Sequence, residues 1–102
     1  MQHIDFTAHQ FERVTPGDYR ARVRSIIGTD GWTAERDLIL IENCWRAIPI
    51  GATAAALVVT PQQAVARRRA IVAAITYRDD VPLEHRGLVL GEMRAAVARE
   101  AL

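Results

Sequence analysis

Two Thr-Pro pairs, at 15–16 and 60–61, each stand directly before a segment whose apolar side chains recur at helical spacing. Threonine is a favoured N-cap residue, and proline suits the first turn of a helix because the N–H that it lacks has no partner there. After the first pair, Tyr19 and Val23 begin an apolar repeat that continues to Gly28, a typical C-terminal stop. Both pairs therefore predict helix starts.

Further helices are predicted along the rest of the chain, and no segment gives a good strand signal, although Ile4 and Phe6 alternate with polar residues near the start. Turn residues or prolines separate the segments. The predicted helices are a short one capped by Thr7 that carries Phe11 and Val14, one from Thr15 to Gly28, one opening at Trp32-Thr33 with Leu38, Ile41, Trp45 and Ile48 inward, one over 52–58, one from Pro61 to about Tyr77, and one after Pro82. The sequence thus predicts an all-α fold, a small helical bundle that contains a tri-helical helix-turn-helix.

The length favours one domain over two, because 102 residues with 50% hydrophobic composition supply one core. We expect residues 1–102 to form it, with an N-terminal helical extension at 1–28, the helix-turn-helix at 32–77 and a C-terminal helix at 82–102. The single cysteine, Cys44, and the absence of an apolar leader favour a cytoplasmic protein. No apolar run has the length of a membrane span, so a membrane is not an expected partner.

Charge is distributed unevenly along the middle of the chain. Residues 60–78 contain four arginines and no acid, a net charge of +4, whereas residues 29–44 contain four carboxylates and one arginine, a net charge of −3. All 13 basic residues are arginine, whose planar fork suits phosphates and guanine edges. This separation is expected when one helix faces a polyanion, although codon bias would also enrich arginine and a solvated face would also carry it.

A helix, a short helix and a basic helix between Trp32 and Ile75 match the arrangement that places a recognition helix in the major groove of double-stranded DNA. We expect the recognition helix at about 61–76, with glutamines for adenine edges, alanines for close approach, and arginines for guanine or phosphate. The predicted DNA-binding residues are Thr60, Gln62, Gln63, Ala66, Arg67, Arg69 and Ala70, of which Gln62, Gln63 and Arg67 are the expected base readers. Arg68 is expected on the inward side of the helix, where it either extends its charged end to solvent along an apolar stem or pairs with a carboxylate such as Asp37 or Glu42.

The run Trp32-Thr33-Ala34-Glu35-Arg36, with Trp45 later in the same helix, resembles the opening of the GcrA-type cell-cycle regulators of alphaproteobacteria, which are Myb-like in a wider sense. The similarity continues through the alanines before Leu57, through Thr60 and into the arginine run, and it covers roughly residues 32–75. Val58 stands where that family usually has glycine. The resemblance implies a transcription regulator that binds DNA, and it implies RNA polymerase or its sigma factor as a partner.

Other functions find less support in the residues. The three histidines share no ligand spacing with one another and Cys44 is the only cysteine, so no metal or other cofactor is expected, and no nucleophile elbow or phosphate loop predicts an enzyme. The alternative to DNA binding is a helical protein–protein interaction module, such as an adaptor or an antitoxin-like or phage-encoded factor, because arginine is also enriched at protein interfaces. Leu83, Leu90 and Val97 recur every seven residues, which favours a homodimer through the C-terminal helix, although this seam could instead close the chain's own core.

Overall fold

The first Thr-Pro pair begins a helix as predicted. The computed structural model describes residues 15–102, so the predicted short helix capped by Thr7 lies outside the described residues. In α2 (Pro16–Ile26), the Thr15 hydroxyl accepts a hydrogen bond from the N–H of Asp18 (3.1 Å), and the Asp18 carboxylate accepts one from the N–H of Thr15 (3.2 Å). Hydrogen bonding by the Thr15 side chain also lowers the pKa of Asp18. The helix ends at Ile26, two residues before the predicted stop at Gly28, and Gly28 follows with a φ of +72° that glycine easily adopts.

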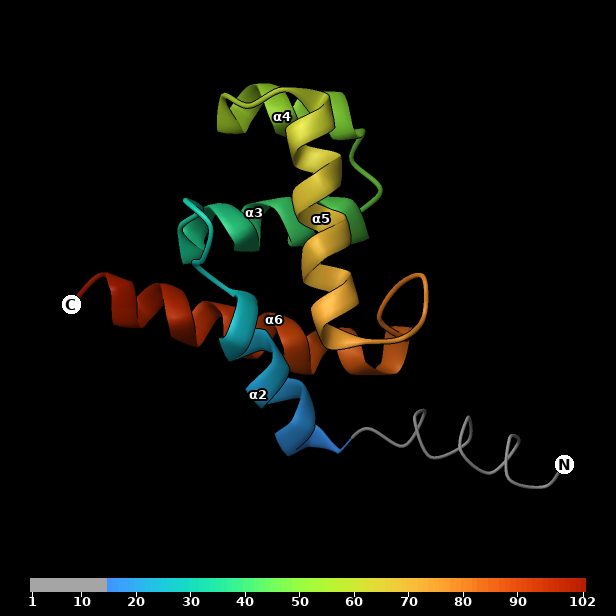
Figure 1. The fold of residues 1–102 in the computed structure, drawn as a ribbon, viewed down its shortest axis with the longest axis vertical. Coiled ribbons are helices and arrows are strands. Elements are labelled where there is room, and N and C mark those ends of the chain that lie inside the picture. The colour runs from blue at the N-terminus through green and yellow to red at the C-terminus, as the bar shows by residue number, and fades with distance from the viewer. Residues whose placement is uncertain (1–14) are drawn as a thin grey trace, which may run out of the picture.

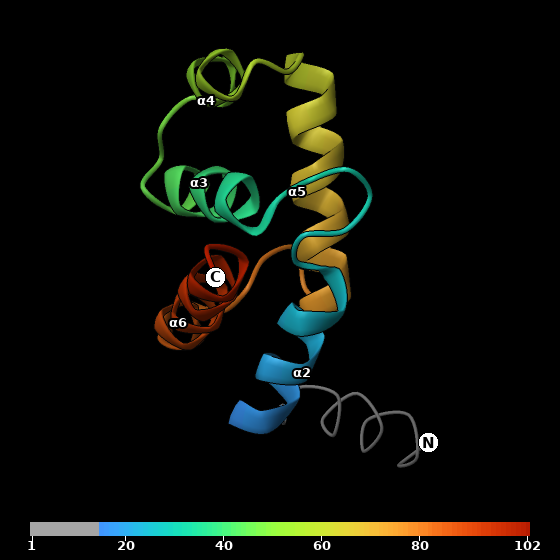
Figure 2. The same ribbon diagram turned by 90° about the vertical axis from the view of Figure 1, so that its left-hand side faces the viewer.

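The described residues form five helices and no strand, which confirms the all-α prediction. After α2 come α3 (Ala34–Trp45), α4 (Ile50–Leu57), α5 (Pro61–Ile75) and α6 (Leu83–Glu100). Figure 1 shows α5 along the long axis of the molecule, and Figure 2 shows α4, α3 and α6 stacked one above another on the same side of it. α5 packs against α2, α3 and α4, and the part of its surface that these helices leave uncovered looks outward. Within residues 15–102 no helix is both long enough and apolar enough to cross a membrane.

Two apolar clusters form the core, and α5 contributes to both. The larger cluster joins α2, α3, α5 and α6, and its buried members are Tyr19, Val23, Ile41, Ile71, Ile75, Val81, Val89 and Met93. The smaller cluster joins α3, α4 and α5, and its buried members are Leu40, Ala54, Leu57 and Ala64. Because both clusters use α5, the position of its outward face is fixed by the packing of the other four helices.

The predicted inward face of α3 was only partly right. Ile41 is buried and Leu38 and Trp45 pack against the larger cluster, but Ile48 lies beyond the end of α3 and is 37% exposed. Leu40 is fully buried although it was not predicted to be. The reason is that α4 and α6 pack on different sides of α3, so this helix buries two faces.

The apolar seam predicted along the last helix divides between core and surface. Leu90 packs against the larger cluster and Val97 is half-buried, whereas Leu83 is 77% exposed. The fully buried residues of α6 include Val89 and Met93. Part of the seam therefore closes the chain's own core, which was the alternative to a dimer, and the homodimer stays a prediction.

Candidate nucleic-acid interface

A three-residue turn, residues 58–60, joins α4 to α5. Val58 ends α4 in the left-handed region, with φ 58° and ψ 47°, and its side chain is 89% exposed. A β-branched residue is strained in this conformation. Thr60 then caps α5. The turn thus sets the direction in which the predicted recognition helix leaves α4.

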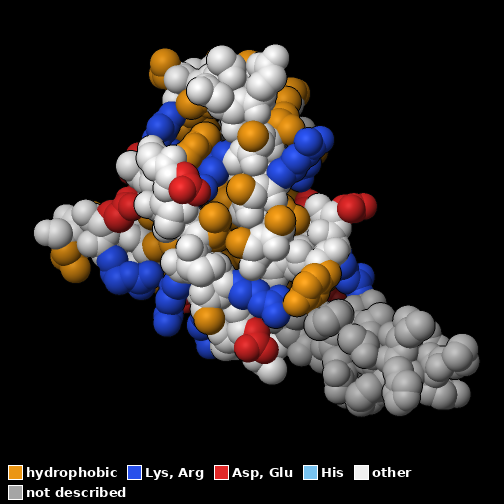
Figure 3. Space-filling model, viewed as in Figure 1, with side chains coloured by type: hydrophobic (Ala, Val, Ile, Leu, Met, Phe, Trp, Pro, Cys, Tyr) orange, Lys and Arg blue, Asp and Glu red, His pale blue; other side chains and the backbone are white. Residues whose placement is uncertain are grey.

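The outward face of α5, defined here as Gln62, Ala66, Arg69, Ala70 and Ala73, is exposed along the helix. These residues are spaced three or four apart, so they lie on one stripe. Figure 3 shows hydrophobic side chains along this helix and basic side chains on either side of it. The four of these residues that were predicted to bind DNA, all except Ala73, are therefore accessible to a partner.

Gln63 is exposed as well, but its amide has a structural partner. The Gln63 Oε1 accepts a hydrogen bond from the N–H of Thr60 (2.9 Å), and the Thr60 hydroxyl accepts one from the N–H of Gln63 (3.1 Å). This reciprocal pair is a capping box. Reading an adenine edge needs both the oxygen and the nitrogen of the amide, so the prediction that Gln63 reads bases conflicts with its role at the start of α5.

The structure contradicts the assignment of Arg67 as a base reader. The Arg67 residue is only 5% exposed, and its guanidinium binds the Asp37 carboxylate in bidentate fashion, with Nε to Oδ1 and Nη2 to Oδ2 both at 2.8 Å. Arg67 Nη2 also donates to the carbonyl of Ile26 (2.9 Å), and Asp37 Oδ2 accepts from the N–H of Gly28 (2.8 Å). Arg67 therefore ties α5 to α3 and to the end of α2, and it is not available to DNA.

The inward arginine that binds Asp37 is Arg67, whereas Arg68 was predicted to be the inward one. Arg67 follows the buried Ala64 by three positions and precedes the buried Ile71 by four, which places it on their side of the helix. Arg68 is half-buried and has no ion pair with any residue from 15 to 102. Asp37 pairs with Arg67 and not with Arg68.

The other suggested partner of Arg68 is also occupied. Glu42 pairs with Arg94 of α6 (2.7 Å) and, less closely, with Arg46 (3.7 Å). The prediction that Arg68 binds Asp37 or Glu42 is therefore wrong on both counts.

Sequence reasoning named Asp37 only as a possible partner of Arg68, and it missed Arg36 as a positioning residue. Asp37 lies between the buried Ala34 and Ile41 on the inward stripe of α3, a spacing that could have identified a buried carboxylate. Arg36 donates to the carbonyl of Leu57 at the end of α4 (2.7 Å), and its guanidinium carbon lies 4.9 Å from the centre of the Trp32 ring. No local signal pairs Arg36 with Leu57, because the contact depends on how α4 folds back onto α3.

Five arginines outside α5, in the described part of the chain, form ion pairs with carboxylates. Glu92, which is buried, binds Arg24 (2.9 Å) and Arg99 (3.5 Å), and Asp80 binds Arg86 (3.4 Å). The hydrogen bond from Arg24 lowers the pKa of Glu92, with a further contribution from Arg99, although burial opposes this shift. These pairs compensate positive charge on the α2, α3 and α6 side of the molecule.

Positive charge beside the outward face of α5 has no such compensation. Arg69 is exposed and, like Arg68, makes no ion pair within the described part of the chain. At the C-terminal end of the helix, Arg22 donates to the carbonyl of Ile75 (3.0 Å) and its guanidinium carbon lies 5.7 Å from the centre of the Tyr77 ring. Guanidinium groups thus lie at the middle of α5 and at its C-terminal end.

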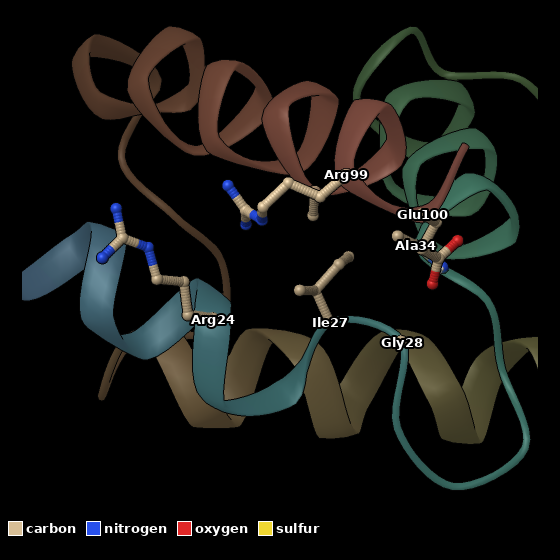
Figure 4. A pocket seen from close by; sticks show the side chains of 7 residues that line it. Arg24, Ile27, Gly28, Ala34, Arg99 and Glu100 are labelled. Atoms are coloured by element: carbon tan, nitrogen blue, oxygen red, sulfur yellow. Dashed lines mark hydrogen bonds between the residues drawn. The ribbon is translucent and has the colours of Figure 1, made fainter. Parts of the chain in front are cut away.

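A separate recess of about 310 Å³ lies where α2, α3 and α6 meet. Figure 4 shows Arg24 and Arg99 on one side of Ile27, and Glu100 near Ala34 on the other. Both arginines bind Glu92, and the Glu100 carboxylate accepts a hydrogen bond from the N–H of Ala34 (2.8 Å). The recess therefore offers a ligand no unpaired arginine, unlike the outward face of α5.

Comparisons with protein-family models, with curated proteins and with solved structures found no match to this chain. Among residues 15–102 there is also no group of three histidine, cysteine or carboxylate side chains that could hold a metal ion. The case for a function consequently rests on the geometry and charge of the site.

Proposed function

We propose that α3, α4 and α5 bind double-stranded DNA as a helix-turn-helix, with the outward face of α5 in the major groove. The observation that carries this proposal is the uncompensated charge of Arg68 and Arg69 beside an exposed stripe of small and amide side chains. Neutralisation of phosphates by arginine supplies most of the affinity of such interfaces, and short side chains let the helix approach base edges. The resemblance of residues 32–75 to GcrA-type regulators supports the same function.

Contacts with bases and with phosphates are assigned to different residues. Gln62 is exposed at the N-terminal end of α5, and no hydrogen bond within the described residues engages its amide, so it is the glutamine suited to an adenine edge. Arg69 lies two turns further along and suits a phosphate or a guanine. Ala66 and Ala70 lie beside these two side chains, and their small size allows DNA to approach the helix closely.

The test is a titration of labelled duplex DNA with the full chain between about 50 and 200 mM salt, because counterion release makes affinity fall steeply over this range. Arg69→Ala should weaken binding to every duplex and lower the slope of log K against log salt by about one contact. Arg94→Ala is the matched control. Arg94 is an exposed arginine on α6 that pairs with Glu42, and its removal should leave the slope unchanged.

Two results would reject the proposal. One is the absence of duplex binding at the lowest salt concentration. The other is a slope that changes equally for Arg69→Ala and Arg94→Ala, because binding would then depend on total charge and not on α5.

A duplex selected from a random pool tests sequence specificity. Gln62→Ala should weaken binding to that duplex more than to unselected DNA.

A protein partner is the second candidate, and the observation that favours it is the run of exposed alanines, Ala66, Ala70 and Ala73, on the same face. Small side chains also allow another helix to pack closely. If Gln62→Ala and Arg69→Ala leave DNA affinity unchanged but prevent capture of a specific protein, α5 is a docking surface for that protein.

A further inference from the structure

A recess of about 370 Å³ lies on the outer surface of α5, and the described side chains around it belong to that helix alone. Its lining residues are Pro61, Gln62, Val65, Ala66 and Arg69. Three of the five residues are apolar, and the other two supply an amide and a guanidinium group. The recess therefore combines apolar side chains with two groups that can bind base edges.

This combination matches one feature of the major groove. Among the four bases, only thymine presents a methyl group there, at C5, and apolar side chains such as alanine contact it in direct readout. The same A·T pair offers adenine N6 and N7, which a glutamine amide can bind together. A recess with Ala66 and Val65 beside Gln62 could thus read both partners of one base pair.

We propose that this recess receives the C5-methyl group of a thymine, an inference that rests on the proposed DNA-binding function and specifies what the site reads. Charge complementarity favours DNA as the occupant, because the half-buried Arg68 and the exposed Arg69 lack acidic partners within residues 15–102. Gln62 and Arg69 are seven residues apart, which is about 10 Å along a helix. With a spacing of about 3.4 Å per base pair, a guanine read by Arg69 lies within about three steps of the adenine read by Gln62.

The test begins with a duplex selected by the full chain from a random pool. Each thymine in that duplex is then replaced by deoxyuridine, one at a time, which removes the C5-methyl group and leaves the hydrogen-bonding groups in place. One position should lose about fourfold in affinity, the effect of one buried methyl group. The other positions should change by less than about twofold.

Two alanine replacements on α5 locate the methyl group. Ala66→Leu fills the recess and should bring the affinity ratio of the thymine and deoxyuridine duplexes at that position close to one. Ala73→Leu makes the same change two turns along the same exposed face and should preserve the ratio. Circular dichroism of both variants checks that the helices remain folded.

The possible failures are distinguishable. If a duplex is selected and bound but no thymine responds to loss of its methyl group, the recess proposal is wrong and the DNA-binding proposal stands. Retention of the full methyl effect in Ala66→Leu would likewise overturn the recess proposal. If no duplex is enriched and none is bound at low salt, both proposals are overturned.

Discussion

Arg67 and Arg69 are two residues apart on α5 and occupy opposite environments. Arg67 is buried between α3 and the end of α2, where the fully buried Asp37 binds it through two hydrogen bonds of 2.8 Å. Arg69 is exposed on the outward face and makes no ion pair in the described range. A single arginine run therefore contributes to both the stability of the fold and the proposed binding surface.

The difference shows that a run of like charges has to be interpreted residue by residue. A guanidinium that is buried requires a partner that satisfies both its charge and its donors, so its replacement affects folding. An exposed guanidinium without a partner contributes little to stability, and its replacement affects the molecules that bind there. The two faces of α5 should consequently respond to mutation in different assays.

Asp37→Ala is the change with the largest expected effect. It leaves the Arg67 guanidinium buried without a counterion and removes the acceptor of the Gly28 N–H. The free energy of unfolding, measured by urea denaturation, should fall by about 3–5 kcal/mol. Arg69→Ala, the comparison on the outward face, should change it by less than about 0.5 kcal/mol.

A double replacement shows whether the loss comes from the unpaired charge. Asp37→Leu combined with Arg67→Met removes both charges and keeps apolar volume between α3 and α5, so it should recover much of the stability lost by Asp37→Ala. If the double variant is as unstable as the single one, hydrogen bonding to the backbone at Ile26 and Gly28 matters more than the ion pair. That result would show that the fold depends on Arg67 and Asp37 mainly to hold residues 26–28.

Glu92 is an intermediate case, because its carboxylate is buried while Arg24 and Arg99 are mostly exposed. The pKa of Glu92 is lower in the folded chain than its usual value of 4.5, so its stabilising effect is complete above that value and is lost as pH falls through the folded pKa. At pH 7, Glu92→Gln should lower the free energy of unfolding by about 1 kcal/mol, a modest value because solvent screens the arginines. This difference from the unmodified chain should shrink towards zero in acid.

The control for Glu92 is Glu35→Gln. Glu35 is exposed and forms no ion pair with residues 15–102. Its replacement should have the smaller effect at pH 7. Equal effects of the two variants would mean that the Glu92 ion pairs add no stability beyond that of a surface charge.

The sequence allowed the helices to be predicted because their boundaries depend on local signals. Thr15 and Thr60 cap the helices that were assigned to them, and α2 ends within two residues of Gly28. The pairing of Arg67 with Asp37 depends on tertiary structure, since residues 26–30 must fold over α5 before Arg67 is covered. The helical spacing of α5 could therefore indicate its inward face and still select the wrong arginine.

Val58→Gly is expected to stabilise the chain. Val58 holds φ at 58° and buries little of its side chain, so glycine relieves backbone strain and loses little packing. The midpoint of urea unfolding should rise by an amount that corresponds to about 1 kcal/mol, partly reduced by the greater freedom of glycine in the unfolded chain. Val59→Gly is the opposing control. Val59 packs against the smaller core cluster, so this change should destabilise the chain.

Gln62 and Gln63 test the comparison between structural and binding roles at the smallest scale. Gln63→Ala removes one half of the capping box at the start of α5 and should lower the free energy of unfolding by about 0.5 kcal/mol. Gln62→Ala removes an exposed amide that has no hydrogen-bond partner in the described residues, and it should change stability by less than that. In titrations with a selected duplex, the order should reverse, and Gln62→Ala should cost about 1–3 kcal/mol of binding free energy. If Gln63→Ala instead weakens DNA binding more than Gln62→Ala, the capping box must open on the DNA, and Gln63 would regain the role of base reader that the free structure assigns to its neighbour.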